Sequence, residues 1–190
     1  MQGRLSPDER RQLLAEARAA VAGALAGRPA RHLEPDGVLG RRAGVFVSLH
    51  HQGDLRGCIG HPEADQPLAT VVPRCAVAAA TGDPRFAPIS LGELDACVIE
   101  ISVLGPITPV GDTSEIVVGR HGLIAEQGWH RGLLLPQVAV EQRWDRDTFL
   151  ARTCGKAGLP PDAWTRGARL LKFEADVFDD AGANPGDGSV

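Results

Sequence analysis

Residues 44–60, GVFVSLHHQGDLRGCIG, hold two runs of strand-forming residues around the turn residues Gln52, Gly53 and Asp54. Alternation of apolar and polar side chains, interrupted by glycine and aspartate, is typical of a β-hairpin. We predict strands over 44–51 and 55–60, joined by a three-residue loop. This register sets Ser48 opposite Cys58 and His50 opposite Arg56. One face then carries Val45, Val47, Leu49, Leu55 and Ile59, and the other carries Phe46, Ser48, His50, Arg56 and Cys58.

A helix is predicted upstream of this hairpin. Ser6-Pro7-Asp8-Glu9 combines a capping box with proline at the first helical position, and apolar residues then recur at helical spacing to about Gly27. The stretch 28–42 contains two prolines and has no period, so it is predicted to be a loop that can fold over a site.

Three elements are predicted directly downstream. Residues 67–81 are rich in alanine and valine and suit a buried helix, which Pro73 should kink or restart. A turn follows over 82–86. Strict alternation over 96–104 then predicts a half-buried strand, with Cys97, Ile99, Ile101 and Val103 on its core face and Val98, Glu100, Ser102 and Leu104 on the other.

The remaining sequence alternates short strands with one helix. Short strands are predicted over 115–118, 122–126 and 129–135. A helix runs from its cap Asp145 to about Lys156, before the stop signals Gly158 and Pro160-Pro161. A last strand covers 171–177, and 179–190 is expected to be a disordered tail. Helices and hairpins without a βαβ rhythm indicate an α+β fold, an antiparallel sheet with flanking helices, in two lobes.

Composition and charge exclude several classes of function. The formal net charge is −4 at pH 7, and no basic run supplies the positive face that phosphate backbones require. No window approaches the roughly 18 consecutive apolar residues of a membrane helix, and the polar start MQGRLSPDERRQ is unlike a signal peptide. We expect a cytoplasmic protein that binds neither nucleic acid nor membranes.

The cysteines argue for free thiols. Cys58, Cys75, Cys97 and Cys154 are widely spaced and form no CxxC pair, which fits a reducing compartment better than a zinc knuckle or a redox dithiol. Cys75, Cys97 and Cys154 are interpreted as packing residues.

The hairpin concentrates residues that can carry chemistry. An arginine binds carboxylates and phosphates in a forked geometry, and a nearby cation lowers the pKa of a thiol. We therefore interpret Cys58 as a nucleophile or redox thiol, Arg56 as its anion clamp and His50 as the acid or base. Two alternatives stay open: Cys58 is an ordinary buried residue, or Cys58 and His61 bind a metal with His50 or His51.

Other candidates flank this cluster or lie elsewhere in the chain. Gly57 and Gly60 sit where a strand glycine often marks a bulge or the close approach of a ligand. Glu100 is either a solvated carboxylate or, if its face covers the hairpin, the partner of Arg56. Asp83 and Arg85 form a turn cap with a surface ion pair on the simplest interpretation. Gln137 is either a polar group at a helix start or a ligand contact.

Five blocks in this order, LRGCIG, DPRF, IEISVL, GLLLPQVA and CGKAGL, resemble the AMMECR family, also called AmmeMemoRadiSam system protein A. The resemblance covers 44–178. It implies an α+β fold with a larger lobe, a smaller β-rich lobe at about 106–136, and a groove between them. Residues 1–43 are expected to pack on this domain as a helix and a loop.

The resemblance also directs attention to particular residues and partners. It implies that Leu55 to Gly60 form the functional patch, and that Asp83 to Phe86, Glu100 and Pro136-Gln137 match the other blocks. Relatives are often encoded beside a Memo-like protein and a radical S-adenosylmethionine protein, so both are expected partners. The reaction, any cofactor and the oligomeric state remain unknown at this stage.

Two hypotheses of different classes result. The first is an enzyme or enzyme subunit that binds a small polar or anionic substrate, with Cys58, His50 and Glu100 as catalytic candidates. Its candidates for ligand binding are Arg56, Gly57, Gly60, Arg85 and Gln137. The second is a non-catalytic adaptor that docks a Memo-like partner through the LRGCIG hairpin, because arginine is enriched at protein interfaces.

Overall fold

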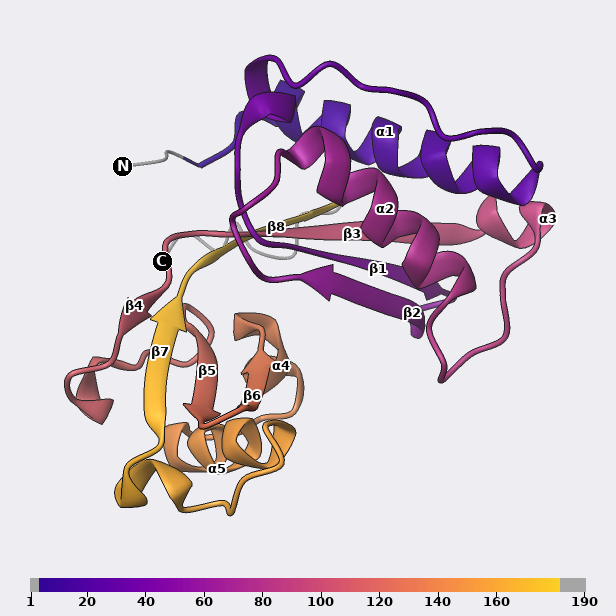
Figure 1. Cartoon of the computed structure of the whole chain (residues 1–190). Helices are drawn as coiled ribbons and strands as arrows, with labels where there is room; N and C mark the ends of the chain where they lie inside the picture. Colours follow the sequence, from indigo (N-terminus) through magenta and orange to yellow (C-terminus); the bar gives the residue numbers. More distant parts are fainter. Residues whose placement is uncertain (1–3, 182–190) are drawn as a thin grey trace. The chain divides into compact units, whose positions relative to one another are not determined.

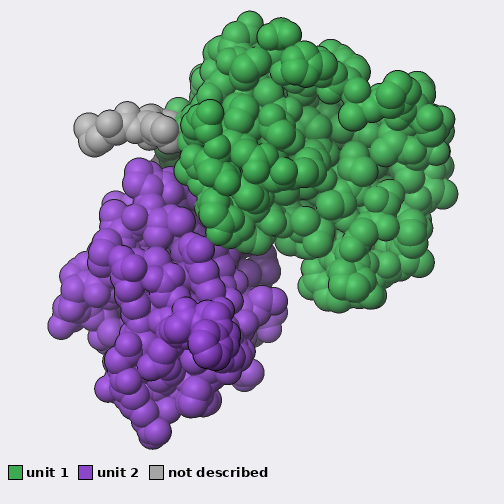
Figure 2. All heavy atoms as spheres, in the orientation of Figure 1, with its two compact units in different colours: residues 1–103, 176–190 green, residues 104–175 purple. Residues whose placement is uncertain are grey.

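A computed structural model describes residues 4–181 of the chain. The chain divides into two compact units, and unit 2, residues 104–175, is inserted into unit 1, residues 1–103 and 176–190 (Figure 2). Unit 2 is longer than the 106–136 expected for the smaller lobe, because 137–175 add two helices and a strand to it.

Unit 1 is built on a four-stranded sheet with the strand order β2-β1-β3-β8. The strands are β1 (Val45–His51), β2 (Asp54–His61), β3 (Cys97–Leu104) and β8 (Ala175–Asp179). β1 pairs antiparallel with both β2 and β3. The predicted α+β class with an antiparallel sheet is confirmed.

Helices α1 (Pro7–Leu25) and α2 (Leu68–Thr81) cover one face of this sheet, and the short α3 (Leu91–Leu94) precedes β3 (Figure 1). The predicted capping box of α1 is present: Ser6 Oγ accepts from the Glu9 N–H, and the Glu9 carboxylate accepts from the Ser6 N–H. α2 continues through Pro73 without a break, so the helix does not restart there. The loop over 28–42 contains one 3-10 turn, Gly37–Gly40.

The core of unit 1 lies between the sheet and these helices. Val45, Val47 and Leu49 of β1 and Ile99 and Ile101 of β3 are completely buried. Their alternation along each strand assigns the intervening residues to the opposite face. The predicted core faces are therefore confirmed for both strands.

The hairpin register is confirmed in its first part and wrong near the turn. The predicted pairs hold from Val45 opposite His61 to Leu49 opposite Gly57, but His50 lies opposite Leu55 instead of Arg56. The turn has two central residues, Gln52 at φ 54° and Gly53 at φ 89°, whose positive φ values suit the twist of a tight hairpin.

The extra residue produced by this shorter turn is Arg56, which forms a β-bulge in β2. The bulge also changes the facing of the residue before it. Leu55 was predicted on the core face, but it is 37% exposed.

Unit 2 holds a second four-stranded sheet, with the order β4-β7-β5-β6. Its strands are β4 (Thr108–Pro109), β5 (Gly122–Gln127), β6 (His130–Leu134) and β7 (Arg169–Phe173), and its helices are α4 (Pro136–Glu141) and α5 (Arg146–Lys156). Asp145 caps α5 as predicted, accepting from the Thr148 N–H at 2.8 Å. Buried Phe149, Leu150 and Cys154 of α5 pack with Leu123 and Ala125 of β5 in a separate core.

Three sequence predictions fail in the second half of the chain. Residues 115–118 form no strand, because Asp112 and Glu115 make a capping box around the 3-10 turn Thr113–Glu115. The single strand expected over 171–177 is interrupted at Glu174, so that β7 and β8 join different sheets. The disordered tail expected over 179–190 is wrong for Asp179, which belongs to β8; residues 182–190 of that prediction lie outside the described residues.

None of the helices within residues 4–181 is long and apolar enough to span a bilayer.

Gly57 and Gly23 predict opposite responses to alanine. A Cβ on Gly57 would lie 2.1 Å from the Ala79 carbonyl oxygen of α2, whereas a Cβ on Gly23 in α1 would meet nothing within 4 Å. Gly57→Ala should lower the free energy of unfolding by about 2 kcal/mol through overpacking, and Gly23→Ala should raise it by about 0.5–1 kcal/mol through helix propensity. Urea unfolding checks both, and an unchanged midpoint for Gly57→Ala would contradict the close packing of β2 on α2.

Candidate functional site

Three polar side chains form a row across adjacent strands of unit 1. Ser48 of β1 lies opposite Cys58 of β2 on one side and opposite Glu100 of β3 on the other. Directly opposed residues share a face, and these three alternate with the core residues under the helices. The row therefore lies on the sheet face that α1 and α2 do not cover.

The thiol of Cys58 is half-buried, and burial is the main influence on its protonation. Burial raises the pKa of Cys58, while a hydrogen bond with the Ser48 side chain and the charge of Arg85 lower it to a smaller extent. The carboxylates of Asp83 and Glu100 also raise the pKa of this thiol. Burial of Cys58 therefore opposes the lowered thiol pKa that a neighbouring cation was expected to produce.

Arg56 is held on a different partner from the one expected. Its Nε donates to Glu93 Oε1 at 2.6 Å and its Nη1 donates to the Ala87 carbonyl at 2.7 Å. This contact holds the pKa of Glu93 below its usual range. Arg56 thus ties the hairpin to 87–93 and pairs with Glu93 rather than with Glu100, because the bulge moves it out of the register that the sequence predicted.

Asp83 is the contact that sequence reasoning missed. Its side chain is 2% exposed, and its Oδ2 accepts from the backbone N–H of Cys58 at 2.9 Å. β2 is an edge strand of the sheet, so this N–H would otherwise be a buried donor without an acceptor. The motif DPRF was the available signal, since aspartate beside a turn often accepts from backbone N–H groups.

Arg85 completes this contact and presents a cation. It donates from Nε to Asp83 Oδ1 at 3.0 Å and from Nη2 to Oδ2 at 2.7 Å, a forked ion pair. The guanidinium holds the pKa of Asp83 well below its usual range. The Arg85 side chain is 54% exposed, and its Nη1 has no hydrogen-bond partner within residues 4–181. Arg85 is therefore the arginine beside Cys58 that can bind an anion.

His50 shares the face of the row. It lies two residues along β1 from Ser48, opposite Val98 of β3. Its Nε2 is buried and makes no hydrogen bond within the described part of the chain. A buried polar atom left unpaired is unusual in a folded protein and often marks a functional site.

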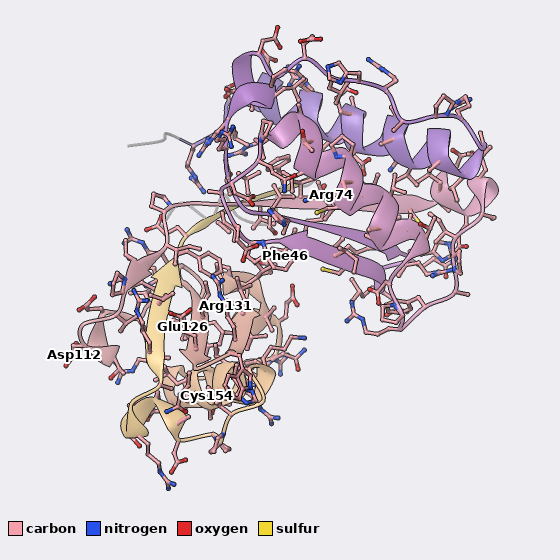
Figure 3. The ribbon with its side chains drawn as sticks, in the orientation of Figure 1. Phe46, Arg74, Asp112, Glu126, Arg131 and Cys154 are labelled. Atoms are coloured by element: carbon pink, nitrogen blue, oxygen red, sulfur yellow. The ribbon has the colours of Figure 1, made fainter. Side chains whose placement is uncertain are left out.

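The two glycines beside Cys58 have packing explanations. Gly57 faces α2, where the Ala79 carbonyl occupies the place of a side chain. Gly60 lies opposite Phe46, whose ring would be 2.2 Å from a Cβ at this position. Phe46 is labelled on the sheet in Figure 3.

The remaining candidates belong to elements other than β1 and β3 or follow Cys58 along β2. Gln137 is in the first turn of α4 in unit 2, the helix-start position that the sequence allowed. His61 Nε2 lies 2.6 Å from Asp65 Oδ1. Across residues 4–181 no three His, Cys, Asp or Glu side chains are grouped to hold a metal ion.

The four cysteines are all free thiols. Cys75, Cys97 and Cys154 are buried in the cores, as predicted for packing residues. Burial raises the pKa of all three, to about 11 for Cys75. Cys58 is only half-buried and is the most accessible of the four.

Asp83→Ala is expected to lower the free energy of unfolding by about 2 kcal/mol at neutral pH, because it leaves the Cys58 N–H buried without an acceptor. The folded pKa of Asp83 is depressed, so the unfolded chain takes up its proton first as the pH falls. The difference between wild type and variant should be complete above about pH 5 and should shrink as the pH falls through the ordinary aspartate pKa of about 3.9.

Urea unfolding at several pH values measures this difference. Exposed Asp95, the C-cap of α3, supplies the control Asp95→Ala, which should change stability by less than about 0.5 kcal/mol. Equal stabilities of Asp83→Ala and Asp95→Ala would contradict the role assigned to Asp83.

Comparison with known proteins identifies a family and several archaeal relatives. The AMMECR1 family matches residues 14–178. A protein from Methanothermobacter thermautotrophicus is 47% identical over 187 residues, covering 94% of this chain and 97% of its own length. Protein MJ0810 from Methanocaldococcus jannaschii is 44% identical over 173 residues and covers 86% of each chain.

A solved structure extends the similarity to the fold. The crystal structure of uncharacterized protein PH0010 from Pyrococcus horikoshii is 39% identical, covers 93% of each chain and superposes with a TM-score of 0.85. The family match spans most of the sequence, including both units and every residue of the row on β1, β2 and β3. The chain belongs to the AMMECR1 family.

Proposed function

We propose that this protein is an enzyme or enzyme subunit whose reacting group is the Cys58 thiol, acting on a small anionic substrate. The observation that carries the proposal is the row of Cys58, Ser48 and Glu100 on adjacent strands, with the Asp83–Arg85 pair fixed to the Cys58 backbone. A thiol, a hydroxyl and a carboxylate placed side by side are the groups required to move a proton from a nucleophile to a base.

The neutral thiol must lose its proton before it reacts. Cys58 and Glu100 lie on the two strands that flank β1, so two strand spacings of about 4.8 Å each separate their backbones. This separation is too large for direct proton transfer. Ser48 lies between them and already hydrogen-bonds the thiol. In the proposed step the thiol proton passes through the Ser48 hydroxyl to the Glu100 carboxylate, and Sγ adds to a carbonyl carbon of the substrate. The C=O π bond breaks, and its electron pair moves to the carbonyl oxygen to give a tetrahedral oxyanion.

Arg85 supplies substrate recognition in this proposal, in place of Arg56. Its fork is preorganised by the buried Asp83 carboxylate, which leaves Nη1 to bind a carboxylate or phosphate. Arg56 is engaged by Glu93 and Ala87 and has a positioning role. His50, with its buried Nε2, is a second candidate for proton transfer on the same face.

Small anions should protect Cys58 from alkylation. A panel of short-chain carboxylates, inorganic phosphate and phosphomonoesters is screened by thermal unfolding, and iodoacetamide labelling is then followed at each cysteine by peptide mass analysis. At least one anion should raise Tm and slow labelling of Cys58, and Arg85→Ala should abolish both effects because it removes the anion contact. Arg120→Ala, which removes an exposed arginine paired with Glu174 in unit 2, should preserve both.

The pH profile of labelling tests the row itself. Ser48→Ala should raise the pH at which Cys58 becomes reactive, because it removes a hydrogen bond that lowers the thiol pKa, and Glu100→Gln should lower that pH. The proposal would be refuted if neither substitution changed the pH profile of Cys58 labelling, or if anions still protected Cys58 from labelling in Arg85→Ala.

An adaptor that docks a Memo-like partner is the second candidate. Two observations favour it: the raised pKa of Cys58, which suits a thiol with no chemical role, and Leu55, which is 37% exposed beside the hairpin turn. An exposed leucine on a rigid hairpin is a suitable anchor for a protein interface. A radical S-adenosylmethionine protein would act in the same assembly.

Co-purification with the Memo-like protein tests the adaptor. If the hairpin docks this partner, Leu55→Asp should reduce recovery of the complex by about tenfold, because a charge replaces a buried apolar contact. Val117→Asp, which changes an exposed valine of unit 2, is the matched control. Full recovery with Leu55→Asp would exclude docking through the turn.

A further inference from the structure

A groove of about 1020 Å³ lies on the helical layer of unit 1, bounded by α1, α2 and the segment 28–33 that follows α1. None of its lining residues belongs to the sheet, so it shares no residue with the row around Cys58. Its volume lies at the upper end of the range for small-molecule sites. The segment that borders it belongs to the loop that the sequence indicated as a possible cover.

The floor of the groove is apolar and made of small side chains. It includes Ala19, Ala22 and Gly23 of α1, and Ala69, Pro73 and Val77 of α2. Gly23 has open space where a side chain would extend, with no atom within 4 Å of an added Cβ. Larger side chains at these positions would fill the groove, because protein interiors are packed to crystal-like density.

The rim of the groove carries excess positive charge. Arg28 and Arg31 come from the segment after α1 and Arg74 comes from α2, against the single carboxylate of Glu16; Arg74 is labelled on its helix in Figure 3. Glu16 lies 3.8 Å from Arg31. Arg74 donates to the neutral amide of Gln66 at 2.9 Å, and the Arg28 guanidinium makes no ion pair or hydrogen bond in the part of the chain that the structure describes.

We propose that this groove binds a free fatty acid, with the hydrocarbon chain along the alanine and glycine floor and the carboxylate at Arg28 and Arg74. The charge of the rim selects an anion over a neutral or cationic amphiphile. A peptide is a poorer occupant, because its backbone N–H and C=O groups would lose water against an apolar floor without gaining partners. A hydrocarbon chain brings no such groups.

Calorimetric titration with dodecanoate, kept below its micelle concentration, tests the proposal on the full chain. Saturable binding of one dodecanoate per chain is expected, and dodecanol and dodecyltrimethylammonium should bind at least about tenfold more weakly because they lack the anion. The protein should not co-sediment with anionic phosphatidylglycerol vesicles, because the site binds a free acid rather than a bilayer surface.

Two substitutions probe the two parts of the site. Gly23→Leu fills the floor and should abolish binding. Arg28→Ala should weaken dodecanoate binding by about tenfold and leave dodecanol binding unchanged, the effect of one charge-assisted hydrogen bond. Arg11→Ala is the matched control, because Arg11 is an exposed α1 residue paired with Asp8 outside the groove.

Three results would overturn the proposal. The first is dodecanoate uptake that does not saturate, and the second is equal affinity for dodecanoate and dodecanol. The third is wild-type affinity for dodecanoate in both the Arg28→Ala and the Gly23→Leu variants when both are folded. Circular dichroism establishes that both variants are folded. Cys58→Ser should bind dodecanoate as wild type does, so this experiment and the anion screen can fail independently.

Discussion

The pairing of β1 with a strand on each side is the constraint on which the rest of unit 1 depends. The same register that buries Val47 and Leu49 beneath α1 and α2 places Ser48 on the opposite face, between Cys58 and Glu100. A shift by one residue would exchange the two faces, so that the polar row would face α1 and α2 in place of the core residues. Burial of the hydrophobic core therefore fixes the positions of the candidate reacting groups.

Local sequence patterns predicted most helices and strands, but they did not predict contacts between residues far apart in the sequence. Alternation was sufficient for the facing of β1 and β3, but it also favoured a three-residue loop, because a two-residue loop would mix apolar and polar residues on each face of the hairpin. The turn that forms has two central residues and is accompanied by a bulge in β2. The resulting bulge moved Arg56 to Glu93. Asp83 contacts Cys58 across 25 residues of sequence, and no periodicity encodes a contact of that kind.

The two arginines near the hairpin illustrate how burial and pairing separate similar residues. The Arg56 side chain is 20% exposed and is fixed between two segments of unit 1, whereas that of Arg85 is 54% exposed and rests on a buried carboxylate. The first arrangement stabilises the hairpin, and the second presents a cation at little further cost in side-chain entropy. Residue type alone left both arginines as candidates for binding an anion, and it could not show that Arg56 is engaged by Glu93 and Ala87.

The insertion of unit 2 imposes an order of assembly on a nascent chain. α1 leaves the ribosome before unit 2, yet two of its ionic partners come after unit 2: Arg10 binds Asp176 at 2.8 Å and Arg18 binds Asp180 at 2.8 Å. Unit 2 is one continuous segment and can be completed before β8 exists. Until β8 emerges, β3 is an unpaired edge, a template that any other extended chain can occupy.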